Sequence, residues 1–193
     1  MAGVNHYDLF QDALTEHLRV TACMTGMWRA AGEVIRIIAC ALQDGGKVLI
    51  CGNGGSAADA QHMAAELAGR FKMERKSLAA LALTTDTSVL TAIGNDYGYD
   101  EVFSRQVRGL GRRGDVLVAI STSGFSPNVL EAATAARELG VTVVALTGSG
   151  SRALEGLADL TLSVPSVETA RIQEAHEFLV HTICEAVELH LCA

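Results

Sequence analysis

The chain has 193 residues, a formal net charge of −7 at pH 7 and a hydrophobic fraction of 49%. This length and apolar content suffice for one globular unit with its own core. The negative charge and the lack of any Lys or Arg run argue against nucleic acid or an anionic membrane as the main partner, because both require a concentrated basic surface.

The N-terminal sequence MAGVNHYDLFQD contains neither a basic nor an apolar signal region. No apolar run in the chain approaches the roughly 18 residues of a membrane span. The five cysteines are odd in number and never form a C-x-x-C pair, which is typical of reduced, buried thiols rather than a disulfide framework. We therefore expect a soluble protein in the cytoplasm.

Two helices are predicted within residues 4–44. Tyr7, Phe10, Leu14 and Leu18 recur at helical spacing, and a second apolar segment ends at the stop signal Asp44-Gly45-Gly46. The first helix precedes the strands and has little sheet of its own to cover. We interpret residues 1–33 as an oligomerisation segment and 34–193 as the main domain, although packing of the first helix on its own subunit is the alternative.

From Lys47 onward, apolar runs of strand length alternate with stretches that favour helices. Runs such as Val116 to Ile120 are apolar without alternation, which indicates strands buried on both faces of a parallel sheet. The pattern predicts an α/β fold, a three-layer αβα sandwich with a five-stranded parallel sheet, closed by a helix over about Thr169 to Leu191. The strand candidates are Lys47 to Cys51, Leu78 to Leu83, Asp115 to Ile120, Val141 to Leu146 and Leu160 to Val164.

The segment from Lys47 to Arg70 reads strand, tight loop, helix. Its loop, GNGGS at 52–56, allows close backbone approach to a ligand, and Ser56 is a candidate cap for the helix. The free N–H groups of a first helical turn favour an anion. The same helix carries His62 and Glu66 four residues apart, and therefore on one face.

A second polar loop follows the strand at 115–120. Pro127 suits the first position of a helix and Ser126 suits its cap. The hydroxyl and N–H groups of Ser121, Thr122, Ser123 and Ser126 could surround a phosphate without Lys or Arg, and a loop that only caps its helix is the alternative.

A dinucleotide site is a competing interpretation of the first loop, because Gly52, Gly54 and Ala57 satisfy a loose GxGxxG/A pattern. That fingerprint also requires an acidic residue about 20 positions further on. The corresponding residue, Asp86, lies too far along the chain, and a dinucleotide site would not require His62 and Glu66. We therefore disfavour this interpretation.

Four segments resemble the phosphoheptose (sedoheptulose 7-phosphate) isomerase family of the sugar isomerase (SIS) domain superfamily: GNGGSAADAQHMAAEL, LTTDTSVLTAIGNDYGYDEVFSRQV, ISTSGFSPNVL and ARIQEAHEFLVHTICE. The resemblance covers residues 34–188 and implies that the sandwich is flavodoxin-like. It implies a cytoplasmic homotetramer that converts sedoheptulose 7-phosphate to D-glycero-D-manno-heptose 7-phosphate through an enediol. This reaction is the first step toward nucleotide-activated heptose for lipopolysaccharide.

The resemblance also implies the roles of individual residues. It places the proton-transfer groups at Glu66 and His181, and the ligands of a metal, usually zinc, at His62, Glu66, Gln173 and His181. The implied substrate contacts are Asn53, Gly54, Gly55, Glu66, Asn95, Asp96, Ser121, Thr122, Ser123, Ser126 and Gln173.

Chemistry supports this assignment, because a carboxylate and an imidazole can move the protons of an aldose–ketose isomerisation near neutral pH. Gln173 and His181, however, are separated by eight residues, roughly 12 Å along a helix, so we hold Gln173 as a substrate or a metal contact. Glu168 stands where the family usually has Asp, which leaves the role of this carboxylate open. A non-catalytic adaptor, like the DnaA-associating relative, is the remaining alternative function; such relatives tend to lose the positions matching Glu66 and His181.

Overall fold

A computed structural model describes residues 5–192. Within this range, five parallel strands form one sheet in the order β2-β1-β3-β4-β5. The strands are β1 (Val48–Gly52), β2 (Ala80–Ala82), β3 (Val116–Ser121), β4 (Thr142–Gly148) and β5 (Leu160–Val164). The helices are α1 (His6–Cys23), α2 (Trp28–Gln43), α3 (Gly55–Ala68), α4 (Thr87–Tyr97), α5 (Ser104–Leu110), α6 (Pro127–Leu139), α7 (Arg152–Glu155) and α8 (Thr169–Cys192), with short 3₁₀ helices η1 (Met24–Met27) and η2 (Tyr99–Glu101). None of these helices has both the length and the apolar character that crossing a membrane requires.

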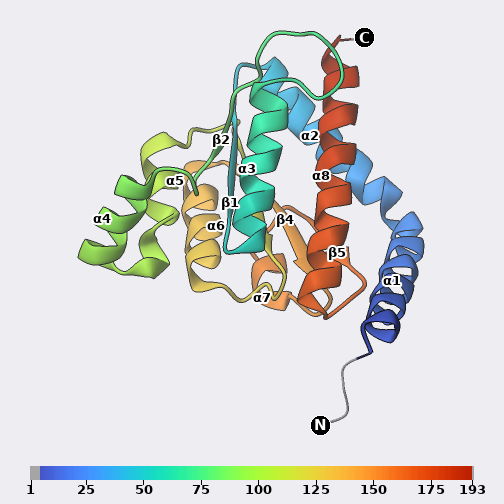
Figure 1. Cartoon of the computed structure of the whole chain (residues 1–193). Coiled ribbons are helices and arrows are strands. Elements are labelled where there is room, and N and C mark those ends of the chain that lie inside the picture. Colours follow the sequence, from blue (N-terminus) through green and yellow to red (C-terminus); the bar gives the residue numbers. More distant parts are fainter. Residues whose placement is uncertain (1–4, 193) are drawn as a thin grey trace.

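The sheet has a helical layer on each face, which confirms the predicted three-layer sandwich (Figure 1). Side chains alternate along each strand, so Val48 and Ile50 of β1 pack in the core formed with α2, α3 and α8. Leu49 and Cys51 point to the other face and pack in the core formed with α5, α6 and α7. β1 and β3 are buried along their whole length, as their unbroken apolar sequences predict.

The predicted strand boundaries are all correct to within two residues, and β2 differs most in length. The expected strand over Leu78 to Leu83 contains only Ala80–Ala82, which pair with Val48–Ile50 of β1. The N–H group of Leu78 instead donates to the carbonyl oxygen of Leu67 in α3, at 3.2 Å. β2 is shorter than predicted because the end of a neighbouring helix, and not a strand, supplies the hydrogen-bond partner of Leu78.

Helices α3 and α8 lie side by side and run in the same direction (Figure 1). Near their first residues, Gly55 of α3 lies directly against the side chain of Gln173. Beyond the end of α3, the N–H groups of Phe71, Lys72 and Met73 donate to the buried carboxylate of Glu188. Contacts between the two helices thus occur at matching heights near their first residues and near their last residues. These contacts fix the axial register of α3 against α8.

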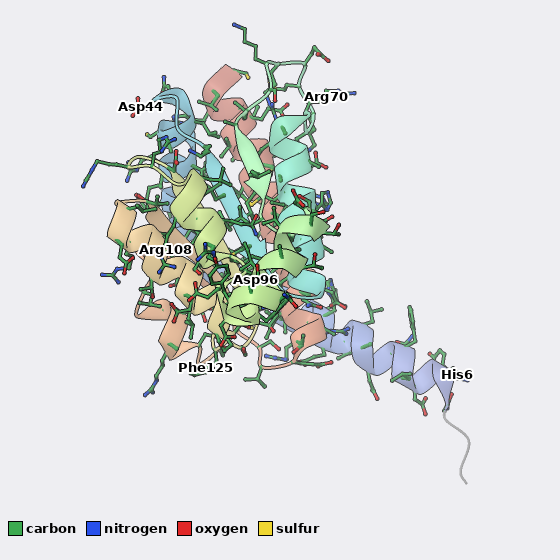
Figure 2. All side chains as sticks on the ribbon, turned by 90° about the vertical axis from the view of Figure 1, so that its left-hand side faces the viewer. His6, Asp44, Arg70, Asp96, Arg108 and Phe125 are labelled. Atoms are coloured by element: carbon green, nitrogen blue, oxygen red, sulfur yellow. The ribbon has the colours of Figure 1, made fainter. Side chains whose placement is uncertain are left out.

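Helix α1 extends away from the rest of the chain, with His6 at its outer end (Figure 2). Its polar contacts with α8 include two: His17 Nδ1 lies 2.8 Å from Glu174 Oε2, and Arg171 Nη1 donates to the carbonyl oxygen of Ala13. The stripe of apolar residues predicted from the sequence is nevertheless exposed in the chain: Tyr7, Phe10, Leu14 and Leu18. Residues 1–4 of the predicted segment 1–33 lie outside the described residues.

Candidate active site

The loop after β1 leads directly into α3. Gly54 precedes the helix with a φ of 55°, a conformation that favours glycine. At Gly55 a Cβ atom would lie 2.4 Å from the side chain of Gln173, so this position also requires the absence of a side chain. The sequence suggested that Ser56 caps the helix. In the structure α3 begins one residue earlier, at Gly55, so Ser56 is instead a buried residue of its first turn.

The loop after β3 presents hydroxyl groups beside the first loop, because β1 and β3 are neighbours in the sheet. Pro127 is the first residue of α6, as predicted. Ser126 occupies the position before it, but its hydroxyl does not cap the helix and lies 3.0 Å from the hydroxyl of Ser121. The N–H group of Gly124 donates to the same Ser121 oxygen at 3.1 Å, which fixes the loop around this hydroxyl pair.

A cavity of about 240 Å³ lies between the two loops and the start of α8. Its lining contains seven of the residues predicted to bind substrate: Asn53, Gly54, Gly55, Ser121, Thr122, Ser126 and Gln173. Thr169, at the start of α8, lines the cavity as well. The neighbouring Glu168 is exposed and is not part of the lining. The lining contains no Lys or Arg, so hydroxyl, amide and backbone groups supply its polar surface.

Four predicted substrate residues do not line this cavity: Glu66, which lies farther along α3, and Ser123, Asn95 and Asp96. Ser123 accepts a hydrogen bond from the N–H group of Phe125, and Asn95 donates to Asp96 on the exposed surface of α4. Tyr99, which follows α4, connects that helix to the cavity, because its hydroxyl donates to Asn53 Oδ1 at 3.3 Å.

The amide of Asn53 is further held by a reciprocal pair of 2.8 Å hydrogen bonds with the buried Asn128. Sequence reasoning missed both Tyr99 and Asn128, because each acts through a contact between segments that are far apart in the chain.

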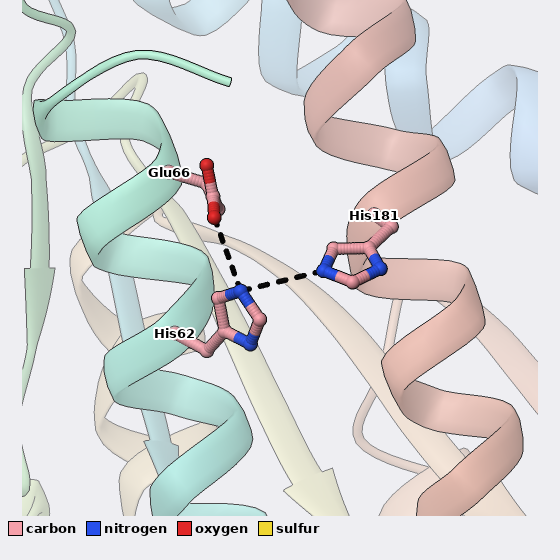
Figure 3. A group of neighbouring side chains, drawn as sticks. All are labelled: His62, Glu66 and His181. Atoms are coloured by element: carbon pink, nitrogen blue, oxygen red, sulfur yellow. Dashed lines mark hydrogen bonds and ion pairs between the residues drawn. The ribbon is translucent and has the colours of Figure 1, made fainter. Parts of the chain in front are cut away.

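Farther along α3, His62 and Glu66 meet His181 of α8 (Figure 3). His62 Nε2 lies 3.1 Å from Glu66 Oε1 and 3.3 Å from His181 Nε2. One nitrogen or oxygen atom from each residue lies within 4.8 Å of the others, and all three side chains are half-buried. The predicted convergence of residues 66 and 181 is therefore present within a single chain.

A fourth side chain, Glu177, joins this group from α8. Its Oε1 atom lies 2.7 Å from His62 Nδ1 and 3.3 Å from His181 Nε2. The sequence contained a signal for it, because Glu177 and His181 have the same four-residue spacing as His62 and Glu66. Sequence reasoning missed it because many glutamates on a helix are simply solvated.

Gln173 is placed at the cavity, beside Gly55, and His181 is placed two turns further along α8, beside His62. This arrangement agrees with the roughly 12 Å separation expected for eight helical residues.

Asp59 is an unforeseen part of the surroundings. It precedes His62 by one turn of α3, and its Oδ2 atom is buried without a hydrogen-bond partner. Burial, together with the negative charge of Glu177, raises the pKa of Asp59 to about 6, against the opposing effect of His62. Asp59 thus adds a second α3 carboxylate, besides Glu66, to the surroundings of His62.

The fold and the paired loops define an SIS-domain protein, and a family model described as SIS domain matches residues 18–148. A phosphoheptose isomerase from Campylobacter concisus is 54% identical over 184 residues, which cover 95% of this chain and 94% of that protein. The structure of the phosphoheptose isomerase from Neisseria gonorrhoeae superposes with a TM-score of 0.91 at 46% identity, covering 96% of this chain and 100% of that one. The enzyme from Francisella tularensis superposes with a TM-score of 0.93 at 37% identity over the same shares. The chain belongs to the phosphoheptose isomerase family.

His176 lies on the buried side of α8, and its Nε2 atom is 3.2 Å from the carbonyl oxygen of Thr147. Burial lowers the pKa of His176 to about 4. Because the unfolded chain binds this proton at a higher pH, the free energy of unfolding should fall as the pH falls from about 6.5 to about 4, by up to ~3 kcal/mol from this residue. We expect His176→Gln to flatten the pH dependence of thermal unfolding in this window.

The matched control is His190→Gln, which changes an exposed histidine of the same helix and should keep the dependence of the unmodified protein. Equal pH dependence of His176→Gln and the unmodified protein would show that His176 does not contribute.

Proposed function

We propose that the chain interconverts sedoheptulose 7-phosphate and D-glycero-D-manno-heptose 7-phosphate through an enediol, in the cytoplasm, as the first step toward nucleotide-activated heptose. The observation that carries this proposal is the convergence of His62, Glu66 and His181 on the same helix pair that frames the hydroxyl-lined cavity. His62 follows Ser56 by six residues, or about 9 Å along α3. This span is comparable with an extended seven-carbon chain, so one substrate can reach both places.

In this proposal the cavity binds the phosphate. Ser121, Thr122 and Ser126 offer hydroxyl donors, and the first N–H groups of α3 add the positive end of a helix dipole. Asn53, Gly54 and Gly55 bring backbone close to the ligand, and Gln173 contacts the sugar from α8. Ser123, Asn95 and Asp96 are proposed contacts as well, supported by the family resemblance; they would complete the site after a loop movement or in a neighbouring subunit.

Glu66 and His181 would transfer the protons. A carboxylate at Glu66 can accept the proton from C1 of the ketose and return it to C2, since both carbons are adjacent in a planar enediol. The imidazole of His181 can protonate and deprotonate the two oxygens. Their separate positions on α3 and α8 are suited to acting on different atoms of one substrate.

The donor atoms fit a divalent metal ion. Two imidazoles and a carboxylate within 4.8 Å of one another are a ligand set typical of zinc, with a further position open to a substrate or to Gln173. We propose that His62, Glu66 and His181 hold one Zn²⁺ per subunit; Gln173, the fourth ligand implied by the family resemblance, lies beside Gly55 and would have to turn toward this group to reach the same ion. When bound, the ion would polarise the oxygens of the substrate and lower the barrier to enediol formation.

The catalytic assignment predicts that Glu66→Gln and His181→Ala each lower kcat with sedoheptulose 7-phosphate by at least ~100-fold, because each removes a proton-transfer group. A coupled assay of aldose formation measures this loss. The exposed His190 of the same helix provides the control, since His190→Ala should keep full activity. Near-normal turnover in either active-site variant would contradict its role, and an unmodified protein that binds the substrate without converting it would favour the adaptor function.

The metal assignment predicts that His62→Ala reduces the zinc retained per subunit, because it removes one of two imidazole ligands. Elemental analysis of the purified variant after dialysis against zinc measures this loss, with His17→Ala as a control that removes an imidazole from α1. Equal zinc content in His62→Ala and the unmodified protein, or a reaction rate that chelator does not change, would contradict the metal site.

We also propose that residues 1–33 form an oligomerisation segment of a homotetramer and that residues 34–193 form the isomerase domain. The exposed apolar stripe of α1 supports this, because exposed patches of this kind commonly mark interaction surfaces. Phe10, for example, is 63% exposed although it lies in the middle of the stripe.

The oligomer proposal predicts that Phe10→Asp shifts the protein from a tetramer to smaller species, because a charge in an apolar contact is not solvated there. Light scattering after size-exclusion chromatography measures the mass. Asp12→Lys is the control, since Asp12 lies on the other side of α1 by helical spacing. An unchanged mass for Phe10→Asp would show that this stripe does not hold the subunits together.

A further inference from the structure

Glu177 contacts both histidines of the active-site group but has no part in the proton transfers proposed above. It lies on α8, four residues before His181, with its side chain 35% exposed. Its Oε1 atom is 2.7 Å from His62 Nδ1, the shortest contact among these four side chains. The proton arrangement of His62 therefore depends on Glu177.

The two ring nitrogens of His62 face different partners. Nδ1 faces Glu177, while Nε2 faces Glu66 Oε1 at 3.1 Å and His181 Nε2 at 3.3 Å. An ionised carboxylate only accepts hydrogen bonds, so a neutral His62 must carry its proton on Nδ1 to satisfy the short contact. The lone pair then lies on Nε2, directed to the space between Glu66 and His181.

We propose that Glu177 is a positioning residue that holds the Nδ1–H tautomer and the ring orientation of His62. A carboxylate that accepts from the second nitrogen of a metal-ligating histidine fixes the ring and increases the basicity of the ligand atom. The inference rests on the proposed metal site, and it extends that site to a residue outside the ligand set. Glu177 acts on His62 from α8 across the helix pair, whereas Glu66 shares the helix of His62.

The contact of Glu177 with His181 is consistent with this role. At 3.3 Å it is longer than the contact with His62, and it involves the same Nε2 atom of His181 that faces His62. If His181 Nε2 donates its lone pair to a metal ion, it has no proton for Glu177. The hydrogen bond from His62 Nδ1 is then the one that Glu177 retains.

The test compares Glu177→Ala and Glu177→Gln with the unmodified protein and with Glu185→Gln. Glu185 is the matched control, because it is a carboxylate of the same helix that pairs only with Lys72 at the surface. Zn²⁺ affinity is measured by competition with a chromophoric chelator. The tautomer of His62 is measured in metal-free protein by ¹⁵N NMR of histidine-labelled samples, with the His62 signal assigned by its loss in His62→Gln.

We expect Glu177→Ala to weaken Zn²⁺ binding about 10- to 100-fold and to lower the Nδ1–H fraction of His62. Glu177→Gln should keep the Nδ1–H tautomer, because its amide oxygen still accepts, and should bind zinc more tightly than the alanine variant. Glu185→Gln should match the unmodified protein. Circular dichroism and thermal unfolding confirm that each variant is folded.

An unchanged tautomer in Glu177→Ala would overturn the proposal even if zinc binding weakens, since the effect would then be simple charge attraction. Equal behaviour of the alanine and glutamine variants, or an equal loss in Glu185→Gln, would overturn it too. The tautomer is measured without metal, so this measurement tests the effect of Glu177 on His62 even if the unmodified protein binds no zinc. A lack of zinc binding by the unmodified protein would reject only the proposed metal site.

Discussion

The parallel packing of α3 against α8 is the constraint on which the active site depends. Each helix carries half of the reactive group, His62 and Glu66 on α3 and Glu177 and His181 on α8. Successive residues of a helix differ by about 100° in direction and 1.5 Å in height. A slip of one residue would therefore separate the two halves, so the chemistry requires a fixed register as well as contact.

A buried carboxylate anchors this register at the far end of the helix pair. Glu188 of α8 accepts hydrogen bonds from the N–H groups that follow α3, and it lies 3.6 Å from Arg75. Burial acts to raise the pKa of Glu188, but the N–H groups of Met73, Phe71 and Lys72, with Arg75, lower it below the usual range of a glutamate. Arg75 in turn donates to the carbonyl oxygens of Glu66 and Leu67. The turn that carries Glu66 is thus tied to α8 through Arg75 and Glu188.

The sequence predicted those features that depend on local pattern. Unbroken apolar runs identified the buried strands, and Pro127 marked the start of α6. The convergence of residues 66 and 181 came from the family resemblance and could not be derived from spacing, because it depends on how α3 and α8 pack. The same limit explains why Glu177 and Tyr99 were missed, and why β2 is shorter than predicted. Each depends on a partner supplied by a distant segment. Glu168, whose role the sequence left open, is exposed.

In the function proposed above, α3 has two roles, and this division explains how a protein with a net charge of −7 can hold a phosphorylated substrate. The first turn of the helix presents backbone N–H groups and the positive end of its dipole, which attract an anion over a short range without a basic side chain. The proton-transfer group begins two turns later, where the dipole has little effect. Because one rigid helix carries both functions, the distance between bound phosphate and reacting carbons is set by the backbone. The hydrogen bonds of Asn53 with Asn128 and Tyr99 hold the loop at the start of that helix, so the anion site and the reactive group keep a constant separation.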